Sequence, residues 1–166
     1  MKQNKNLIIG MGAVLVIFVG IVWLSSPAPS VNSQAESGEP GLFTAFEKMF
    51  DFGTISMAAG KVSHSFSIRN EGNAPVTIKK IYTSCMCTSA DLILKGKRFG
   101  PFGMVGHGFV PSINKILDAG EEASVEVTFD PAAHGPAGVG PIQREVTIEN
   151  SAGEPLSLEI EAVVTP

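Results

Sequence analysis

The chain has 166 residues and carries 12 basic and 16 acidic side chains, a formal net charge of −4. Without Lys2 and Lys5 near the N-terminus, 10 basic and 16 acidic side chains remain. This acidic excess, with no basic stripe, excludes a typical nucleic-acid binder and argues against binding to anionic lipid head groups. The 18 glycines and 11 prolines indicate many turns and favour a β-rich domain over a helical one.

The N-terminal segment predicts a membrane anchor. From Leu7 to Leu24 the chain reads LIIGMGAVLVIFVGIVWL without a charge, and about 18 residues is near the lower limit for a transmembrane helix. Lys2 and Lys5 precede it, so residues 1–6 are expected in the cytoplasm and everything after Leu24 outside, in the periplasm or extracellular space. The alternative is secretion after signal cleavage, although the apolar run exceeds the usual signal core of about 7–15 residues.

Residues 25–41 are expected to form a flexible linker. They read SSPAPSVNSQAESGEPG, which is rich in serine, proline and glycine and nearly free of apolar side chains. Such a composition cannot bury enough apolar surface to fold by itself. The folded domain is therefore predicted to cover residues 42–166.

The folded domain shows the period-2 alternation of β-strands. In a fifth run, VTIKKIYTSCMC at residues 76–87, the parity slips at Lys79-Lys80, as a β-bulge would make it. After the slip, Cys85 and Cys87 share a face with Ile81. With no helical period outside the anchor, the pattern predicts an all-β, immunoglobulin-like sandwich preceded by a single N-terminal transmembrane helix. The four regular runs are KVSHSFSIRN at 61–70, EEASVEVTFD at 121–130, REVTIEN at 144–150 and PLSLEIEAVV at 155–164.

One segment interrupts this pattern. Residues 95–116 read KGKRFGPFGMVGHGFVPSINKI, and their glycine content is too high for an expected strand. Long ordered loops on small sandwiches are usually functional or folded back on the body. This insertion is expected to cover a sandwich edge, and its part from Arg98 to Ser112 is the expected contact surface for another protein.

Four motifs in a fixed order carry a resemblance to a known family. They are FDFGTI from Phe50, HSFSIRNEGNAPVTI from His64, SCMCT from Ser84 and LDAGEEASVEVTFDP from Leu117. The chain resembles a bacterial domain-of-unknown-function family, numbered 1573, of exported immunoglobulin-like sandwiches that are similar in pattern to ASH and major-sperm-protein-like domains. The resemblance covers most of Phe46 to Val164 and implies a fold and a location, but no activity.

The chain departs from this family pattern in two places. The usual Cys-Gly-Cys-Thr motif appears here with Met86 in the glycine position, and the glycine-rich loop is longer than the pattern implies. Both departures indicate a specialised branch of the family.

Cys85 and Cys87, the only cysteines, have three open interpretations. The first is a disulfide. On a regular strand the two Cα atoms would lie about 6.5–7 Å apart, the outer edge of what a disulfide accepts. So small a ring stabilises little, although a strained bond suits thiol-redox exchange. The second interpretation is a pair of free thiols packed in the core.

The third interpretation is a metal site. Sulfur ligands select copper(I), or zinc together with imidazole. The candidate ligands stand on the Cys-Met-Cys motif or beside glycines in loops that could fold toward it, and they are Cys85, Cys87, Met104, His107 and His134. His64 is instead expected to be a half-buried, hydrogen-bonded core residue, because it alternates with Val62 and Phe66.

No catalytic arrangement emerges from the sequence. There is no candidate Ser-His-Asp set, no carboxylate pair and no phosphate-binding loop, and Asp51 is expected to cap a turn. The leading interpretation is a non-enzymatic, membrane-tethered module outside the cytoplasm with an interaction or structural role and no small-molecule substrate. A copper- or zinc-binding protein is the alternative, and a thiol-redox partner is the third interpretation.

Overall fold

The computed structural model describes residues 42–106 and 110–166. The predicted anchor, Leu7 to Leu24, and the candidate ligand His107 lie outside these ranges. Within them, no helix is long and apolar enough to cross a membrane. The only helical elements described are two short 3-10 turns, η1 (Met57–Ala59) and η2 (Gly135–Gly138).

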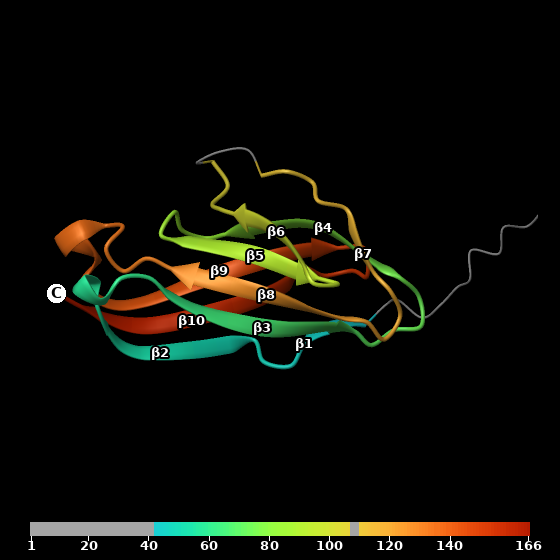
Figure 1. The fold of residues 1–166 in the computed structure, drawn as a ribbon, viewed down its shortest axis with the longest axis horizontal. Helices are drawn as coiled ribbons and strands as arrows, with labels where there is room; N and C mark the ends of the chain where they lie inside the picture. The colour runs from blue at the N-terminus through green and yellow to red at the C-terminus, as the bar shows by residue number, and fades with distance from the viewer. Residues whose placement is uncertain (1–41, 107–109) are drawn as a thin grey trace, which may run out of the picture. The chain divides into compact units, whose positions relative to one another are not determined.

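The described residues form two five-stranded sheets (Figure 1). The first contains, in spatial order, β1 (Phe43–Ala45), β3 (Val62–Asn70), β8 (Glu122–Phe129), β5 (Thr88–Leu94) and β6 (Lys97–Phe102). The second contains β2 (Met49–Ser56), β10 (Leu156–Thr165), β9 (Gly140–Asn150), β4 (Val76–Thr83) and β7 (Lys115–Leu117). All neighbours are antiparallel except β2 and β10, which are parallel. The predicted all-β sandwich is confirmed.

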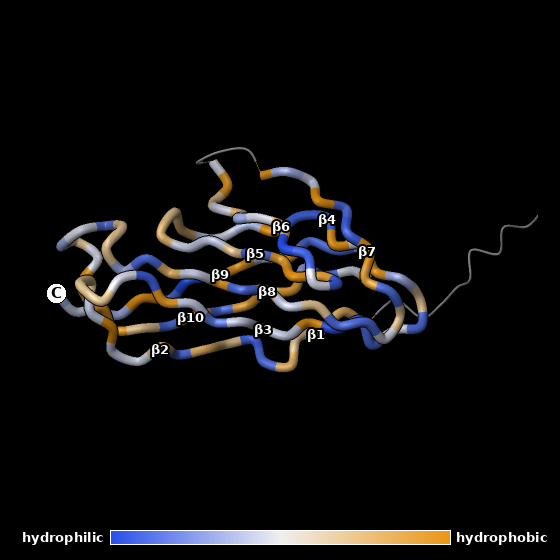
Figure 2. Tube along the Cα trace, in the orientation of Figure 1, coloured by the Kyte–Doolittle hydropathy of each residue, from blue (hydrophilic) through white to orange (hydrophobic). Residues whose placement is uncertain are grey.

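The core lies between the two sheets, where the predicted alternation places it. Phe66 and Val125 from the first sheet, and Ile148 and Leu158 from the second, are all 0% exposed. Figure 2 shows the same alternation as changes between hydrophobic and hydrophilic colour along the strands. Each such buried side chain contributes about 1.5–3 kcal/mol relative to exposure to water, so the period-2 pattern determines which face of each strand turns inward.

The predicted parity slip in β4 is confirmed. The pairing of β4 with β9 shifts register between Ile78 and Lys80, which is where an extra residue changes the face that follows. Ile78 and Ile81 are both fully buried although they are three positions apart. Without the slip one of them would face solvent.

Two expectations for the middle of the chain are wrong. β4 ends at Thr83 instead of continuing through Cys87, and residues 84–87 form a turn into β5. The glycine-rich segment also contains a strand, β6, which pairs with β5 at the edge of the first sheet. A glycine keeps its backbone donor and acceptor, so an edge strand whose side chains need little packing tolerates it.

Gly100 in β6 provides a test of this edge. Its φ is +137°, and a Cβ there would lie 2.9 Å from the carbonyl oxygen of Ala90 and 2.5 Å from Asp91 Oδ1. We expect Gly100→Ala to destabilise the fold by about 1–3 kcal/mol in urea unfolding of the full chain. The control is Gly103→Ala, where a Cβ meets nothing within 4 Å; equal losses in the two variants would contradict the close approach.

Candidate functional site

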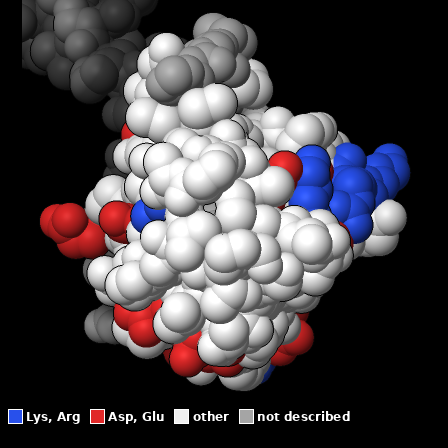
Figure 3. All heavy atoms as spheres, turned by 90° about the vertical axis from the view of Figure 1, so that its left-hand side faces the viewer, with Lys and Arg blue, Asp and Glu red and all other residues white. Residues whose placement is uncertain are grey.

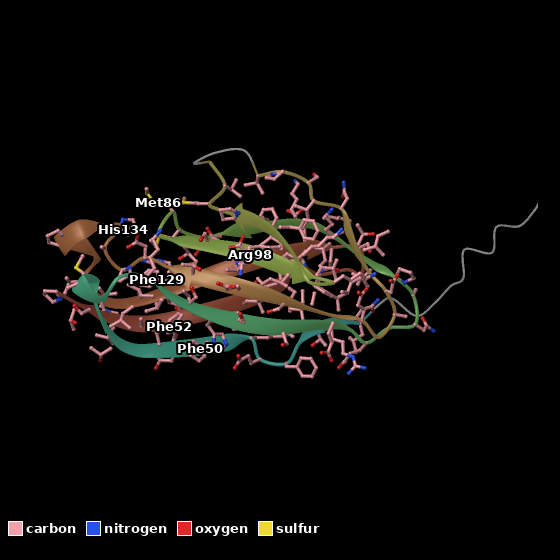
Figure 4. The ribbon with its side chains drawn as sticks, viewed as in Figure 1. Phe50, Phe52, Met86, Arg98, Phe129 and His134 are labelled. Atoms are coloured by element: carbon pink, nitrogen blue, oxygen red, sulfur yellow. A yellow bond between two sulfur atoms is a disulfide. The ribbon has the colours of Figure 1, made fainter. Side chains whose placement is uncertain are left out.

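Two connections meet at one end of the sandwich: the turn between β4 and β5, and the link between β8 and β9. Figure 4 shows Met86 of the first and His134 of the second at this end. Thr83 ends β4 and holds the turn, because its Oγ1 donates to the carbonyl oxygens of Cys85 (2.9 Å) and Thr88 (3.0 Å). These two hydrogen bonds hold the backbone of the turn without using a sulfur atom, and the Cys87 amide donates in addition to Cys85 Sγ at 3.3 Å.

Cys85 and Cys87 are joined by a disulfide in this turn. Their Cα atoms are 5.3 Å apart, closer than a regular strand would place them and inside the range that a disulfide accepts. Cys85 is half-buried and Cys87 is only 3% exposed, whereas Met86 between them is 58% exposed. Of the three interpretations of the pair, the structure has the disulfide, and Cys85 carries its more accessible sulfur.

His134 approaches this accessible sulfur from the β8–β9 link. Its Nε2 lies 3.2 Å from Cys85 Sγ, and its side chain is exposed. The imidazole sits just before η2, and the lack of a side chain at Gly138 leaves room for it, since a Cβ there would lie 3.2 Å from His134 Cβ. The sequence named His134 as a candidate ligand, and the fold brings it to the cysteine pair from 49 residues away.

Arg144 contacts the other sulfur, and sequence reasoning missed it. Its Nε donates to Cys87 Sγ at 3.2 Å, and one of its terminal nitrogens donates to the carbonyl oxygen of Gln143 at 2.7 Å. A signal was present in the sequence, because Arg144 shares its strand parity with the buried Val146 and Ile148. A charged residue on the inward face of a strand needs a polar partner, and here that partner is a cysteine sulfur.

The structure brings together three of the five predicted ligands. Cys85 Sγ, Cys87 Sγ and a ring nitrogen of His134 all lie within 4.8 Å of one another. Met104 comes near the turn through its backbone, as it forms an isolated bridge with Thr83.

Two further residues were assigned structural roles. His64 is paired with Glu47 and stacked on Phe50 with ring centroids 3.6 Å apart, so its expected role as a half-buried, hydrogen-bonded residue is confirmed. Asp51 accepts a hydrogen bond from the Gly53 amide at 2.8 Å, but both residues lie within β2, where the pairing with β10 shifts register, so the expected turn cap is wrong.

The surface around the site has few charges. Figure 3 turns this end of the sandwich toward the viewer, and most of the central surface lacks lysine, arginine, aspartate and glutamate. Basic side chains gather on one side and acidic ones lie toward the rim. Arg144 is a charged side chain that contacts a sulfur atom of the pair directly.

Comparison with known proteins finds a family model that matches part of the chain, and no activity comes with it. The model described as "Protein of unknown function (DUF1573)" matches residues 43–99, which confirms the resemblance predicted from the four motifs. No curated protein matches the chain.

One solved structure supports the fold and nothing beyond it, and two others align with lower scores. A protein of unknown function from Porphyromonas gingivalis W83 aligns with a TM-score of 0.55 at 14% identity, over 74% of this chain and 46% of that one. The chain thus spans less than half of that protein. An ASH/PapD-like domain of human CEP192 aligns at TM-score 0.46 and 16% identity, over 84% and 98% of the two chains. The VesB protease of Vibrio cholerae aligns with a TM-score of 0.48 at 20% identity, over 73% of this chain and 31% of that one.

Proposed function

Because residues 43–99 match a family whose function is unknown, we propose a function from the geometry of the cysteine pair. The chain is a membrane-tethered β-sandwich outside the cytoplasm, and its Cys85–Cys87 disulfide exchanges with the thiols of a partner protein. One observation carries this proposal. The disulfide lies in a surface turn with an imidazole on its accessible sulfur and a guanidinium on its buried one.

The unequal exposure of the two sulfurs gives the exchange a direction. A thiolate of the partner attacks Cys85 Sγ, the S–S bond breaks, and its electron pair passes to Cys87 Sγ. The Arg144 N–H at 3.2 Å stabilises the negative charge that forms there. Attack at Cys87, which is 3% exposed, would instead require the turn to open.

A second thiolate completes the reaction. It attacks the partner's own sulfur in the mixed disulfide and releases Cys85 as a thiolate beside His134. The partner's dithiol is then oxidised to a disulfide, Cys85 and Cys87 have gained the two electrons, and the two protons pass to them or to solvent. The reverse sequence reduces a partner disulfide.

The small ring supports a chemical rather than a structural role. The cysteines are two positions apart, and closing so short a loop removes little conformational entropy from the unfolded chain. The turn is already held by Thr83 and by the Asp130 amide, which donates to the Cys87 carbonyl oxygen at 2.8 Å. Opening the disulfide therefore leaves the backbone of the turn supported.

The proposed location rests on the N-terminal sequence. An uncharged span of about 18 residues after two lysines predicts an anchor with the sandwich outside the cytoplasm, where disulfides form and persist. For the linker that the sequence predicts at residues 25–41, the root-mean-square end-to-end distance of a flexible chain of this length is about 20–25 Å. The site would then act on partners close to the membrane surface.

Two single-cysteine variants test the exchange. In Cys87→Ser the accessible Cys85 remains, and in Cys85→Ser the buried Cys87 remains. We expect the full-length Cys87→Ser chain, in detergent micelles, to form a mixed disulfide with oxidised glutathione at least about tenfold faster than Cys85→Ser, because rates follow access to the attacking sulfur. Mass spectrometry of acid-quenched samples measures both rates.

The wild-type disulfide supplies the second half of this test. In mixtures of reduced and oxidised glutathione it is expected to titrate between its two states. A disulfide that stays closed throughout these mixtures, or equal rates in the two variants, would contradict the proposal.

A module that binds a partner without thiol chemistry is the second candidate. It is supported by an open groove of about 490 Å³ beside β6, where Phe99 and Phe102 face Pro111 and Ile113. The groove includes part of the expected contact surface from Arg98 to Ser112. For this candidate, a bound partner would remain bound after both cysteines are changed to serine, whereas exchange requires them.

A further inference from the structure

We propose that the reduced site binds one copper(I) ion through Cys85 Sγ, Cys87 Sγ and His134 Nε2. This function goes beyond thiol exchange and does not rest on it, because a reduced pair can hold a metal whether or not it reacts with a partner. The ligands come from the β4–β5 turn and the β8–β9 link, so the fold and not the local sequence assembles them.

The spacing of the ligand atoms suits a shared ion. All three lie within 4.8 Å of one another, and Cys85 Sγ is 3.2 Å from His134 Nε2. Protein metal–sulfur and metal–nitrogen bonds of about 2.0–2.3 Å place ligand atoms roughly 3.5–4 Å apart around one ion. Once the disulfide is open, the two sulfurs separate toward this spacing with the backbone of the turn in place.

The charge of the site favours copper(I) over zinc. Thiolates are soft ligands that select copper(I) or zinc, and imidazole suits both metals; two cysteines and one histidine with an open fourth position can also hold zinc. A zinc ion with two thiolates is neutral and would leave the positive charge of Arg144 without compensation. A copper(I) ion with two thiolates carries one negative charge, and the Arg144 guanidinium beside Cys87 Sγ compensates it. Burying a charge without a partner would be costly.

The oxidation state of the pair controls access to the ion. A dithiol reductant opens the S–S bond, gives two electrons to the sulfurs and becomes a disulfide itself. Binding then displaces one proton from each thiol to solvent, and the copper remains copper(I) throughout. In the disulfide state neither sulfur is a thiolate, so the site loses the two ligands that select a soft ion.

The test uses the full chain reduced with a phosphine, desalted without oxygen, and titrated with copper(I) held by the coloured chelator bathocuproine disulfonate. We expect one copper(I) per reduced chain, read from the loss of chelator colour, and none in the disulfide form. Cys85→Ser and Cys87→Ser should each abolish copper(I) binding in competition with this chelator. His134→Asn should weaken it by about tenfold or more, the scale of loss when a metal site is altered.

Two controls separate the site from general effects of substitution. His64→Asn removes a histidine outside the three-residue group, where the ring pairs with Glu47, and Met86→Leu removes the exposed sulfur between the cysteines. Both should keep wild-type affinity. Because His134 is exposed, its variant is expected to fold, and circular dichroism checks this.

Three results would overturn the proposal. One is binding by the disulfide form equal to that of the reduced form. Another is an unchanged affinity in His134→Asn. The third is displacement of copper(I) by an equal concentration of zinc, which would assign the site to zinc.

Discussion

Replacing Asn70 with alanine is expected to cost about 3 kcal/mol of unfolding free energy. The side chain is 0% exposed, and its Nδ2 donates to the carbonyl oxygens of Ala74, Leu117 and Asp118 at 2.8, 3.0 and 3.2 Å. Its Oδ1 accepts from the Gly72 amide at 3.1 Å. Alanine leaves buried backbone groups of two separate loops without partners, and each unsatisfied group costs about 1–3 kcal/mol. Urea unfolding of the full chain measures the loss.

Asn73 supplies the matched control. It lies in the same turn but is exposed, so Asn73→Ala should change stability by no more than about 0.5 kcal/mol. Similar losses in the two variants would show that asparagine acts in this turn through its backbone preference. The proposed role of Asn70 as a buried clamp between loops would then be wrong.

Replacing Arg144 with glutamine is expected to shift the thiol–disulfide equilibrium about tenfold toward the disulfide. The guanidinium favours negative charge on Cys87 Sγ, which exists only after the disulfide opens. Its loss therefore destabilises the reduced form, and a tenfold change corresponds to about 30 mV in the reduction potential. Equilibration with glutathione mixtures, followed by trapping of free thiols, measures the shift.

The control for charge alone is Arg98→Gln. Arg98 lies in β6, where its guanidinium is bonded to Glu126 and Asp91 and these carboxylates raise its pKa. That variant should leave the equilibrium unchanged, and Arg144→Lys should fall between wild type and Arg144→Gln because it keeps the charge without the planar group. An unchanged equilibrium in Arg144→Gln would remove Arg144 from the proposed mechanism.

The two proposed activities share the same sulfurs and therefore exclude one another at any moment. The disulfide state is ready to accept electrons from a dithiol, and the reduced state offers the soft ligands for copper(I). Bound copper(I) would occupy Cys85 Sγ and block its attack on an oxidant. The redox state of the pair thus decides which of the two chemistries the site performs.

The sandwich was largely predictable because burial in a β-strand alternates with a period of two. In β3, Phe66 and Ile68 alternate with polar residues, and in β8 Val125 and Val127 do the same. This alternation can be recognised from the sequence without any tertiary information. Even the bulge at Lys79-Lys80 could be seen, because one extra residue shifts the apolar parity. β5 also alternates, with Ala90, Leu92 and Leu94 buried, but it was not among the predicted strands, and β6 lies inside the segment that its glycines assigned to a loop.

The sequence by itself determined the strand faces, and it named Cys85, Cys87 and His134 among the candidate site residues. Only the tertiary structure decided that Cys85 and Cys87 sit in a turn, that Arg144 contacts one sulfur, and that His134 contacts the other. Hydrophobic periodicity is a local property that any short segment displays. Which loop ends meet depends on strand order in the two sheets, and that order is set by packing between residues far apart in the chain.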